Sequence, residues 1–175
     1  DSSVDFPWRS KGRNLILSNR HNSRNIFIAM RTSHYNENKI GVNSQPWRDA
    51  SIKDIKKIIN ATKEINSEEK IFCFTNKKVW KEIRNMEVNL SKIIFLDEDN
   101  SDILDYLNQD SLLINNGNGI GAASFALGIK TLYLHHTVLH FWHTSHSNSL
   151  AYPCEFRNSK IRINDLRLCL IHIYE

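Results

Sequence analysis

The chain has 175 residues, of which 41% are hydrophobic and 24% are charged, with six Gly and three Pro. This length favours a single domain, and the composition excludes wholesale disorder as well as collagen-like or proline-rich architecture. No apolar run approaches the ~18 residues of a transmembrane helix, and the first residues lack the apolar core of a signal peptide.

The net charge of +4 is confined to one end of the chain. Residues 1–31 carry six basic and two acidic side chains, so the rest of the sequence is balanced. A nucleic-acid footprint is a basic patch on a folded face with motif support, and this segment has neither. We predict no nucleic-acid partner, a basic leading segment at 1–23, and contact of that segment with a membrane surface or another domain.

The three cysteines, Cys73, Cys154 and Cys169, form no CxxC pair. An odd number of unpaired cysteines is typical of a reducing compartment. The sequence therefore predicts a cytoplasmic protein, with peripheral association at the inner face of a membrane as an open alternative.

From residue 24 onward, short apolar runs alternate with helical patterns. The run Ile26–Met30 is typical of a strand buried on both faces, and the polar stretch 32–48 reads as a long loop. Ser51 is a candidate N-cap for an amphipathic helix, because isoleucines recur after it at helical spacing.

The alternation continues to residue 134. Further strands are predicted at 70–75, 92–96, 111–115 and 130–134. Two helices are predicted with N-caps at Asn76 and at Asn100 or Ser101, and a further helix is predicted at 119–127. The chain after His135 reads as irregular until Asn164, where a closing helix or strand begins. This order predicts an α/β fold, a Rossmann-like three-layer sandwich with a mainly parallel five-stranded sheet, forming one domain over residues 24–175.

The segment 111–128, SLLINNGNGIGAASFALG, is the most informative part of the sequence. A strand ends in two Asn, passes Gly117, Gly119 and Gly121, and opens into a helix of small residues. Glycine allows a close approach of backbone and ligand, and a helix N-terminus attracts anions. The spacing is not GxGxxG, which disfavours a classical dinucleotide site. A phosphate- or sugar-nucleotide-binding loop is preferred, and glycines that only allow tight packing are the alternative.

This progression of strands, Asn/Gly turn and small-residue helix ending Ala-Leu-Gly-Ile-Lys resembles the nucleotide-sugar-binding, C-terminal half of GT-B glycosyltransferases. It is most similar to bacterial enzymes that build surface polysaccharides, and the resemblance spans roughly residues 24–155. A GT-B enzyme has two Rossmann-like domains around one active site. The resemblance therefore implies that this chain is one half of a two-domain enzyme, with a missing N-terminal domain.

The resemblance also implies roles for particular residues. Donor diphosphate binding falls on the turn and helix start, with Arg31, which ends the opening strand, beside the donor or acceptor. The catalytic base would lie in the missing domain or be His34. The turn residues concerned are Asn116, Gly117, Asn118, Gly119 and Ile120.

Five histidines fall within the twelve residues 135–146. Nearby carboxylates are lacking and helix propensity is poor, so a loop in which His136, His140 and Trp142 contact a sugar or acceptor is preferred. A metal site in this histidine cluster is the alternative. The acidic stretch that follows the third predicted strand is interpreted as helix capping and solvated charge rather than a metal site. Its members are Asp97, Glu98, Asp99, Asp102 and Asp105.

Together with these observations, the resemblance implies a glycosyltransferase domain that binds a nucleotide-diphosphate sugar and transfers the sugar to a glycan or lipid-linked acceptor, without metal or other cofactor. Two alternatives stay open. One is a non-catalytic Rossmann-like module that binds a ligand or a partner. The other is a metal-dependent hydrolase built on the histidine cluster.

Overall fold

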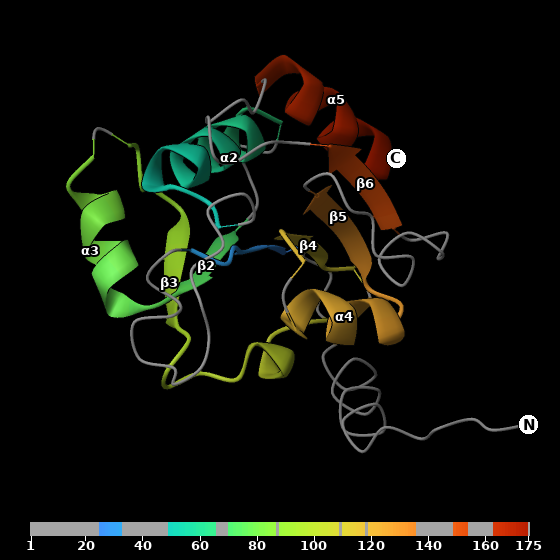
Figure 1. The fold of residues 1–175 in the computed structure, drawn as a ribbon, viewed down its shortest axis with the longest axis horizontal. Helices are drawn as coiled ribbons and strands as arrows, with labels where there is room; N and C mark the ends of the chain where they lie inside the picture. The colour runs from blue at the N-terminus through green and yellow to red at the C-terminus, as the bar shows by residue number, and fades with distance from the viewer. Residues whose placement is uncertain are drawn as a thin grey trace, which may run out of the picture.

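Parallel strands and helices alternate along the chain in the computed structural model (Figure 1). The structure describes residues 25–32, 49–65, 70–86, 88–108, 110–117, 119–135, 149–153 and 163–174. The strands are β1 (Ile26–Ala29), β2 (Ile71–Thr75), β3 (Ile93–Asp97), β4 (Leu112–Asn115), β5 (Lys130–His135) and β6 (Ser149–Pro153). The helices are α2 (Ile52–Ile65), α3 (Lys77–Arg84), the 3-10 turn η2 (Ile103–Asp105), α4 (Gly119–Ala126) and α5 (Ile163–Tyr174).

The six strands of the described residues pair in parallel, in the order β3-β2-β1-β4-β5-β6. From β1 at the centre of the sheet, the chain builds outward to β3 and then returns to the other side of β1 with β4. The order of strands therefore reverses between β1 and β4. In open parallel sheets, ligands bind at the carboxyl ends of the strands where this reversal occurs.

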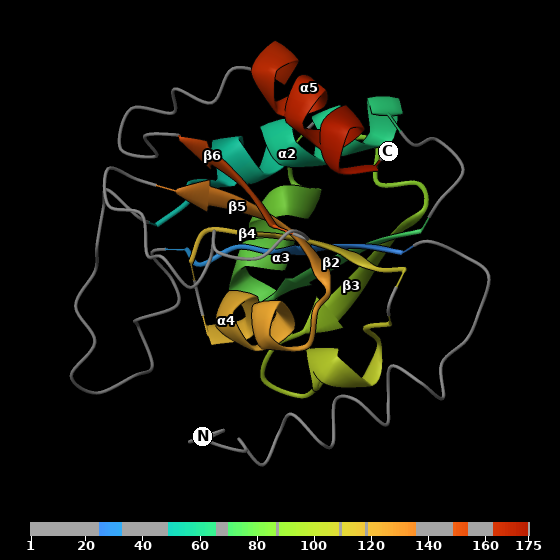
Figure 2. The same ribbon diagram turned by 90° about the vertical axis from the view of Figure 1, so that its right-hand side faces the viewer.

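Helices cover both faces of the sheet, which confirms the predicted three-layer α/β fold (Figure 2). On one face, residues of α2, α3 and α5 pack on alternate residues of the strands, such as Ile28 and Ile114. On the other face, η2 and α4 pack on the intervening residues, such as Phe27 and Leu113. The alternation follows from the strand geometry, which sends successive side chains to opposite faces.

Local capping explains where two of the helices begin. Ser51 and Asp54 form a capping box at the start of α2: the Asp54 carboxylate accepts from the Ser51 N–H at 2.9 Å, and the Asp54 N–H donates to Ser51 Oγ at 3.2 Å. Asn76 caps α3 by accepting from the Val79 N–H at 2.9 Å. Both predicted N-caps are confirmed.

Two details differ from the sequence prediction. The sheet has a sixth strand, β6, which pairs with β5 at the edge and lies where an irregular segment was expected. The predicted helix after residue 101 is only the short turn η2, and its N-cap is Asp102 rather than Asn100 or Ser101. The closing element was predicted as a helix or a strand, and it is the helix α5, which packs against α2.

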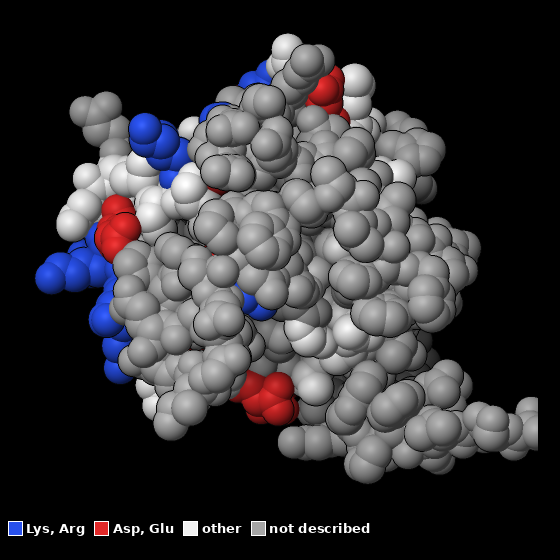
Figure 3. All heavy atoms as spheres, viewed as in Figure 1, with Lys and Arg blue, Asp and Glu red and all other residues white. Residues whose placement is uncertain are grey.

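Charge is unevenly distributed on the surface although residues 32–175 are balanced overall. Lys and Arg side chains gather over the side of the molecule occupied by α3, where four of eight residues are basic and exposed (Figure 3). Exposed acidic side chains occur after β3, at Asp99, Asp102 and Asp105. Although the net charge of residues 32–175 is balanced, the surface therefore has a basic region at α3 and an acidic region after β3.

Candidate functional site: a clasp and a glycine turn where the strand order reverses

Polar residues follow the two strands between which the strand order reverses. Arg31 comes two residues after β1, and Asn116 comes directly after β4. Both residues are buried, Arg31 with 8% and Asn116 with 2% of its surface exposed. Buried polar groups need hydrogen-bond partners. Their partners show how the two strand ends are joined.

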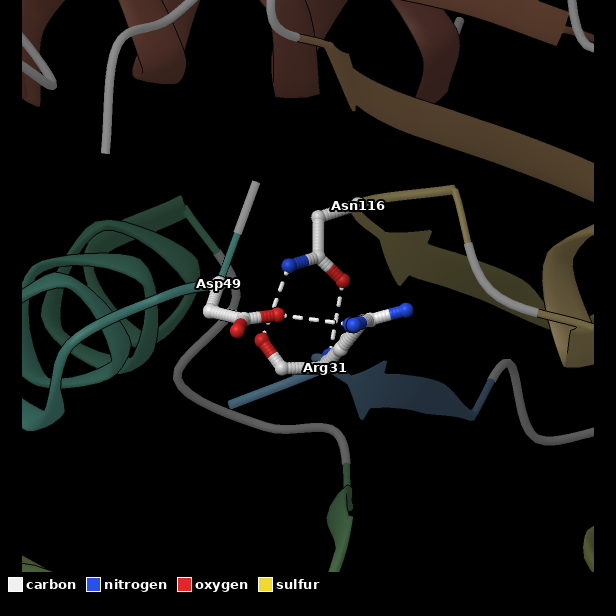
Figure 4. Close-up of polar contacts among 3 residues, drawn as sticks. All are labelled: Arg31, Asp49 and Asn116. Carbon is white, nitrogen blue, oxygen red and sulfur yellow. Dashed lines mark hydrogen bonds and ion pairs between the residues drawn. The ribbon is translucent and has the colours of Figure 1, made fainter. Parts of the chain in front are cut away.

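Asn116 bonds the backbone of Arg31 with both ends of its side-chain amide (Figure 4). Its Oδ1 accepts from the Arg31 N–H at 2.7 Å, and its Nδ2 donates to the Arg31 carbonyl at 2.9 Å. The two residues are 85 positions apart in the sequence. This pair of bonds fixes the end of β1 to the start of the turn that leads into α4.

The Arg31 side chain forms a buried ion pair with Asp49. Arg31 Nε lies 2.6 Å from Asp49 Oδ1, with 9% and 2% of the two side chains exposed. The next residue, Ala50, donates its N–H to the Arg31 carbonyl at 2.9 Å and forms a parallel bridge with Thr32. We name Arg31, Asp49 and Asn116 the clasp, because they join three segments that are distant in sequence.

The turn after β4 depends on two glycines for packing. Gly117 has φ +81°, and a Cβ there would lie 2.8 Å from the Tyr133 ring. A Cβ on Gly121 would lie 2.3 Å from Asn115 Oδ1, which accepts from the Gly117 N–H at 2.9 Å. Asn115 is fully buried, and no partner for its Nδ2 is found within the described part of the chain. The packing interpretation therefore accounts for Gly117 and Gly121.

Gly119, the first residue of α4, is different. It is exposed, its φ is not in the left-handed region, and a Cβ there would meet no atom of the described residues within 4 Å. Packing and backbone strain therefore give no reason for a glycine at this position. A residue without a side chain at a helix N-terminus does leave the N–H groups accessible to an anion. Ile120 is half-buried and packs on the side of the sheet that α4 covers.

The remaining predicted site residues lie outside the described residues. These are the candidate base His34, the turn residue Asn118, and the histidine-cluster residues His136, His140 and Trp142. Their roles stay predictions, as does the basic leading segment 1–23. Within the described ranges, no group of three His, Cys, Asp or Glu residues could hold a metal ion.

A second polar cluster stands at the end of β3. Asp97 accepts from Asn100 Nδ2 at 2.5 Å and from the Asp99 N–H at 3.3 Å, and Lys77 Nζ lies 3.4 Å away. Burial acts to raise the pKa of Asp97, but the hydrogen bonds from Asn100 and Asp99 and the charge of Lys77 outweigh it and hold the pKa below its ordinary value. The predicted capping role of the acidic stretch is confirmed for Asp102, which accepts from the Leu104 N–H.

Sequence reasoning missed Asp49. It ends a long polar stretch in which nothing marks one acidic residue above the others. The available signal was indirect: an Arg that directly follows a fully buried strand needs an acidic partner if it is itself buried.

Comparison with known proteins supports the fold. No family model matches the chain, and no curated protein is similar to it in sequence. Among solved structures, a family 9 glycosyl transferase from Veillonella parvula superimposes with a TM-score of 0.62 at 10% identity, covering 95% of this chain and 51% of that one. The ADP-heptose LPS heptosyltransferase II of E. coli gives a TM-score of 0.58 at 12% identity, with 95% and 50% covered.

The chain therefore has an α/β fold that is also found in glycosyltransferases, and the expected structural resemblance to GT-B enzymes is confirmed. At this sequence identity the likeness establishes the fold. The chain spans about half the length of both solved structures. No helix in the described ranges is both long and apolar enough to span a membrane.

Proposed function

We propose that the chain is the nucleotide-sugar-binding domain of a GT-B-like glycosyltransferase. The observation that carries this proposal is the position of the clasp and of the accessible glycine Gly119. Both adjoin the carboxyl ends of β1 and β4, where the strand order reverses and where open α/β sheets bind ligands. The likeness of the fold to two glycosyltransferase structures also supports the proposal.

The chemistry of the two groups suits a diphosphate. The N-terminus of α4 offers backbone N–H groups and the positive end of the helix dipole. The guanidinium of Arg31 offers N–H donors in a planar fork that matches phosphate oxygens. When a sugar leaves a nucleotide sugar, negative charge develops on the diphosphate. Preorganised donors at that position would stabilise the charge and so speed the transfer.

The rest of the reaction belongs to residues and partners outside the described structure. We propose that the acceptor is a glycan or a lipid-linked sugar, and that a second α/β domain completes the active site. That domain or His34 would supply the base. The sugar or acceptor would contact His136, His140 and Trp142. Association of the enzyme with the inner face of a membrane would bring it to a lipid-linked acceptor.

Thermal shift measurements of the 175-residue chain with UDP-, GDP-, CDP- and ADP-sugars test the proposal. ADP-heptose belongs in the panel because a structurally similar enzyme carries it in its name. A ligand present at 100 times its Kd raises stability by about 2.7 kcal/mol, which is readily measured. Stabilisation by at least one nucleotide sugar is expected. If none stabilises the chain and zinc does, the histidine-cluster hydrolase becomes the better interpretation.

A matched pair of variants links binding to the glycine turn. Gly119→Val should weaken nucleotide binding at least tenfold while leaving stability within about 0.5 kcal/mol, because the added side chain points into open space. Lys77→Val is the control, since Lys77 is the first residue of α3 and is likewise exposed. Equal affinity of wild type and Gly119→Val would remove the turn from the site. A separate assay of sugar transfer, with the chain combined with a second domain, distinguishes an enzyme from a non-catalytic binding module. Transfer is expected for the enzyme and not for the binding module.

A further inference from the structure

We propose that Asp49 is a positioning residue: it holds Arg31 in a fixed place near the N-terminus of α4, so that the site selects a diphosphate over a monophosphate. The inference rests on the proposed function, because it assigns one phosphate to the N-terminus of α4 and the other to Arg31. Asp49 itself need not touch the ligand.

The ion pair between Arg31 and Asp49 is buried and closely spaced. The side chains of Arg31 and Asp49 are 9% and 2% exposed, and Nε lies 2.6 Å from Oδ1. A surface arginine samples many rotamers, whereas a guanidinium held at Nε by a buried carboxylate has its plane and direction fixed. Figure 4 shows one terminal guanidinium nitrogen on the side of the group that lies away from Asp49.

The backbone of Arg31 is also fixed, by hydrogen bonds from two other segments of the chain. Ala50, next to Asp49, donates to the Arg31 carbonyl, and Asn116 bonds both the N–H and the carbonyl of Arg31. Asn116 lies three residues before Gly119, where α4 begins. The clasp therefore fixes the position of Arg31 with respect to the turn that leads into α4.

A fixed separation between two anion-binding groups discriminates by the number of phosphates. The two phosphorus atoms of a diphosphate are held at one separation by their bridging oxygen. A diphosphate thus engages both groups at little cost in conformational entropy, whereas a monophosphate engages only one. A mobile Arg31 would have to be ordered on binding and would lose this advantage. The clasp therefore predicts a high ratio of diphosphate to monophosphate affinity.

The test is the affinity of the 175-residue chain for UDP, GDP, ADP and CDP and for the matching monophosphates, by isothermal titration calorimetry. Wild type should prefer the diphosphate at least tenfold for the nucleotide it binds. Asp49→Asn should lower diphosphate affinity about tenfold, the scale of one charge-assisted hydrogen bond, and leave monophosphate affinity within about twofold. A merely structural role for Asp49 would lower both affinities together.

Asp54→Asn is the matched control. Asp54 is also a buried aspartate of this region, but its described contacts are those of the α2 capping box. Its substitution should lower the melting temperature and leave the ratio of affinities unchanged. If Asp49→Asn does not fold, Arg31→Lys serves instead, because it keeps the cation beside Asp49 but lacks the fork. It should reduce the ratio as well.

The outcomes separate the two proposals. If wild type prefers a diphosphate and Asp49→Asn or Arg31→Lys leaves the ratio unchanged, the positioning role of Asp49 is wrong and the proposed function stands. If wild type binds diphosphate and monophosphate equally, the positioning role is likewise overturned. If wild type binds no nucleotide at all, both proposals fall.

Discussion

Two polar clusters stand at the carboxyl edge of the sheet, and they are built in different ways. The hydrogen bonds of the Asp97 cluster are local, since Asn100 is three residues away, and its cation Lys77, at the start of α3, has 74% of its side chain exposed. The clasp joins positions up to 85 residues apart, and both members of its ion pair are buried. The first cluster closes a turn, whereas the second joins the strands between which the strand order reverses. Of the two clusters, the clasp is the one at the reversal of strand order, which is where open α/β sheets generally bind ligands.

Removing the cation of each ion pair should give the largest difference in stability between the two clusters. Arg31→Ala leaves Asp49 as a buried charge without its cation, and we expect it to lower the free energy of unfolding by about 3–5 kcal/mol. Lys77→Ala removes an exposed partner and should cost less than about 0.5 kcal/mol. Urea unfolding at neutral pH measures both. Similar values for the two variants would show that the clasp is not a buried ion pair.

Substitution of the glycines that follow β4 should have the next largest effect on stability. Gly117→Ala places a side chain in a left-handed conformation and against the Tyr133 ring, so a loss of about 2–3 kcal/mol is expected. In Gly119→Ala the added methyl group extends into open space, so the free energy of unfolding should change by less than about 0.5 kcal/mol. Thermal unfolding compares the two substitutions directly. A larger loss for Gly119→Ala would mean that Gly119 serves packing and not ligand access.

Asn116→Ala probes the link between the strand ends without removing a charge. The variant loses an acceptor for the Arg31 N–H and one of the two donors to the Arg31 carbonyl. We expect a loss of about 2 kcal/mol, because a buried N–H is left without that acceptor. Amide hydrogen exchange should show faster exchange at Arg31. Unchanged exchange there would contradict the proposed connection.

The smallest expected effect is the pH dependence of the local cluster. The folded-state pKa of Asp97 lies below its ordinary value of 3.8, so its contribution is present above pH 3.8 and is lost as the pH falls through the lower folded-state pKa. Asp97→Asn should therefore reduce stability at pH 6 more than at pH 3. Urea midpoints of wild type and variant at the two pH values measure the difference. An equal loss at both values would show that the charge of Asp97 does not contribute.

The sequence predicted the central part of the fold because each of those elements has a local signal. Five strands are short apolar runs, and Ser51 and Asn76 cap the helices they precede. The sixth strand was missed because Ser149–Pro153 is short, ends in proline and shows no clear alternation. It exists through pairing with β5 at the sheet edge, where proline is tolerated.

The site was predictable in part for the same reason. The Asn/Gly turn before α4 has a recognisable composition, and Arg31 follows a buried strand. The different roles of its glycines were not predictable, because they depend on Tyr133 and Asn115, whose positions the fold determines. Asp49 was missed since its partner lies 18 residues away across a long polar stretch. Contacts between distant segments leave no local pattern.

The most direct test of the account is to map a bound nucleotide on the chain by NMR. UDP, GDP, ADP and CDP are titrated in turn while backbone amide chemical shifts are followed. We predict that at least one causes saturable changes that are largest at Arg31, Gly119 and Gly121 and absent at Asp97 and Asn100. Changes centred on the Asp97 cluster, or no saturable change with any of the four, would contradict a diphosphate site where the strand order reverses.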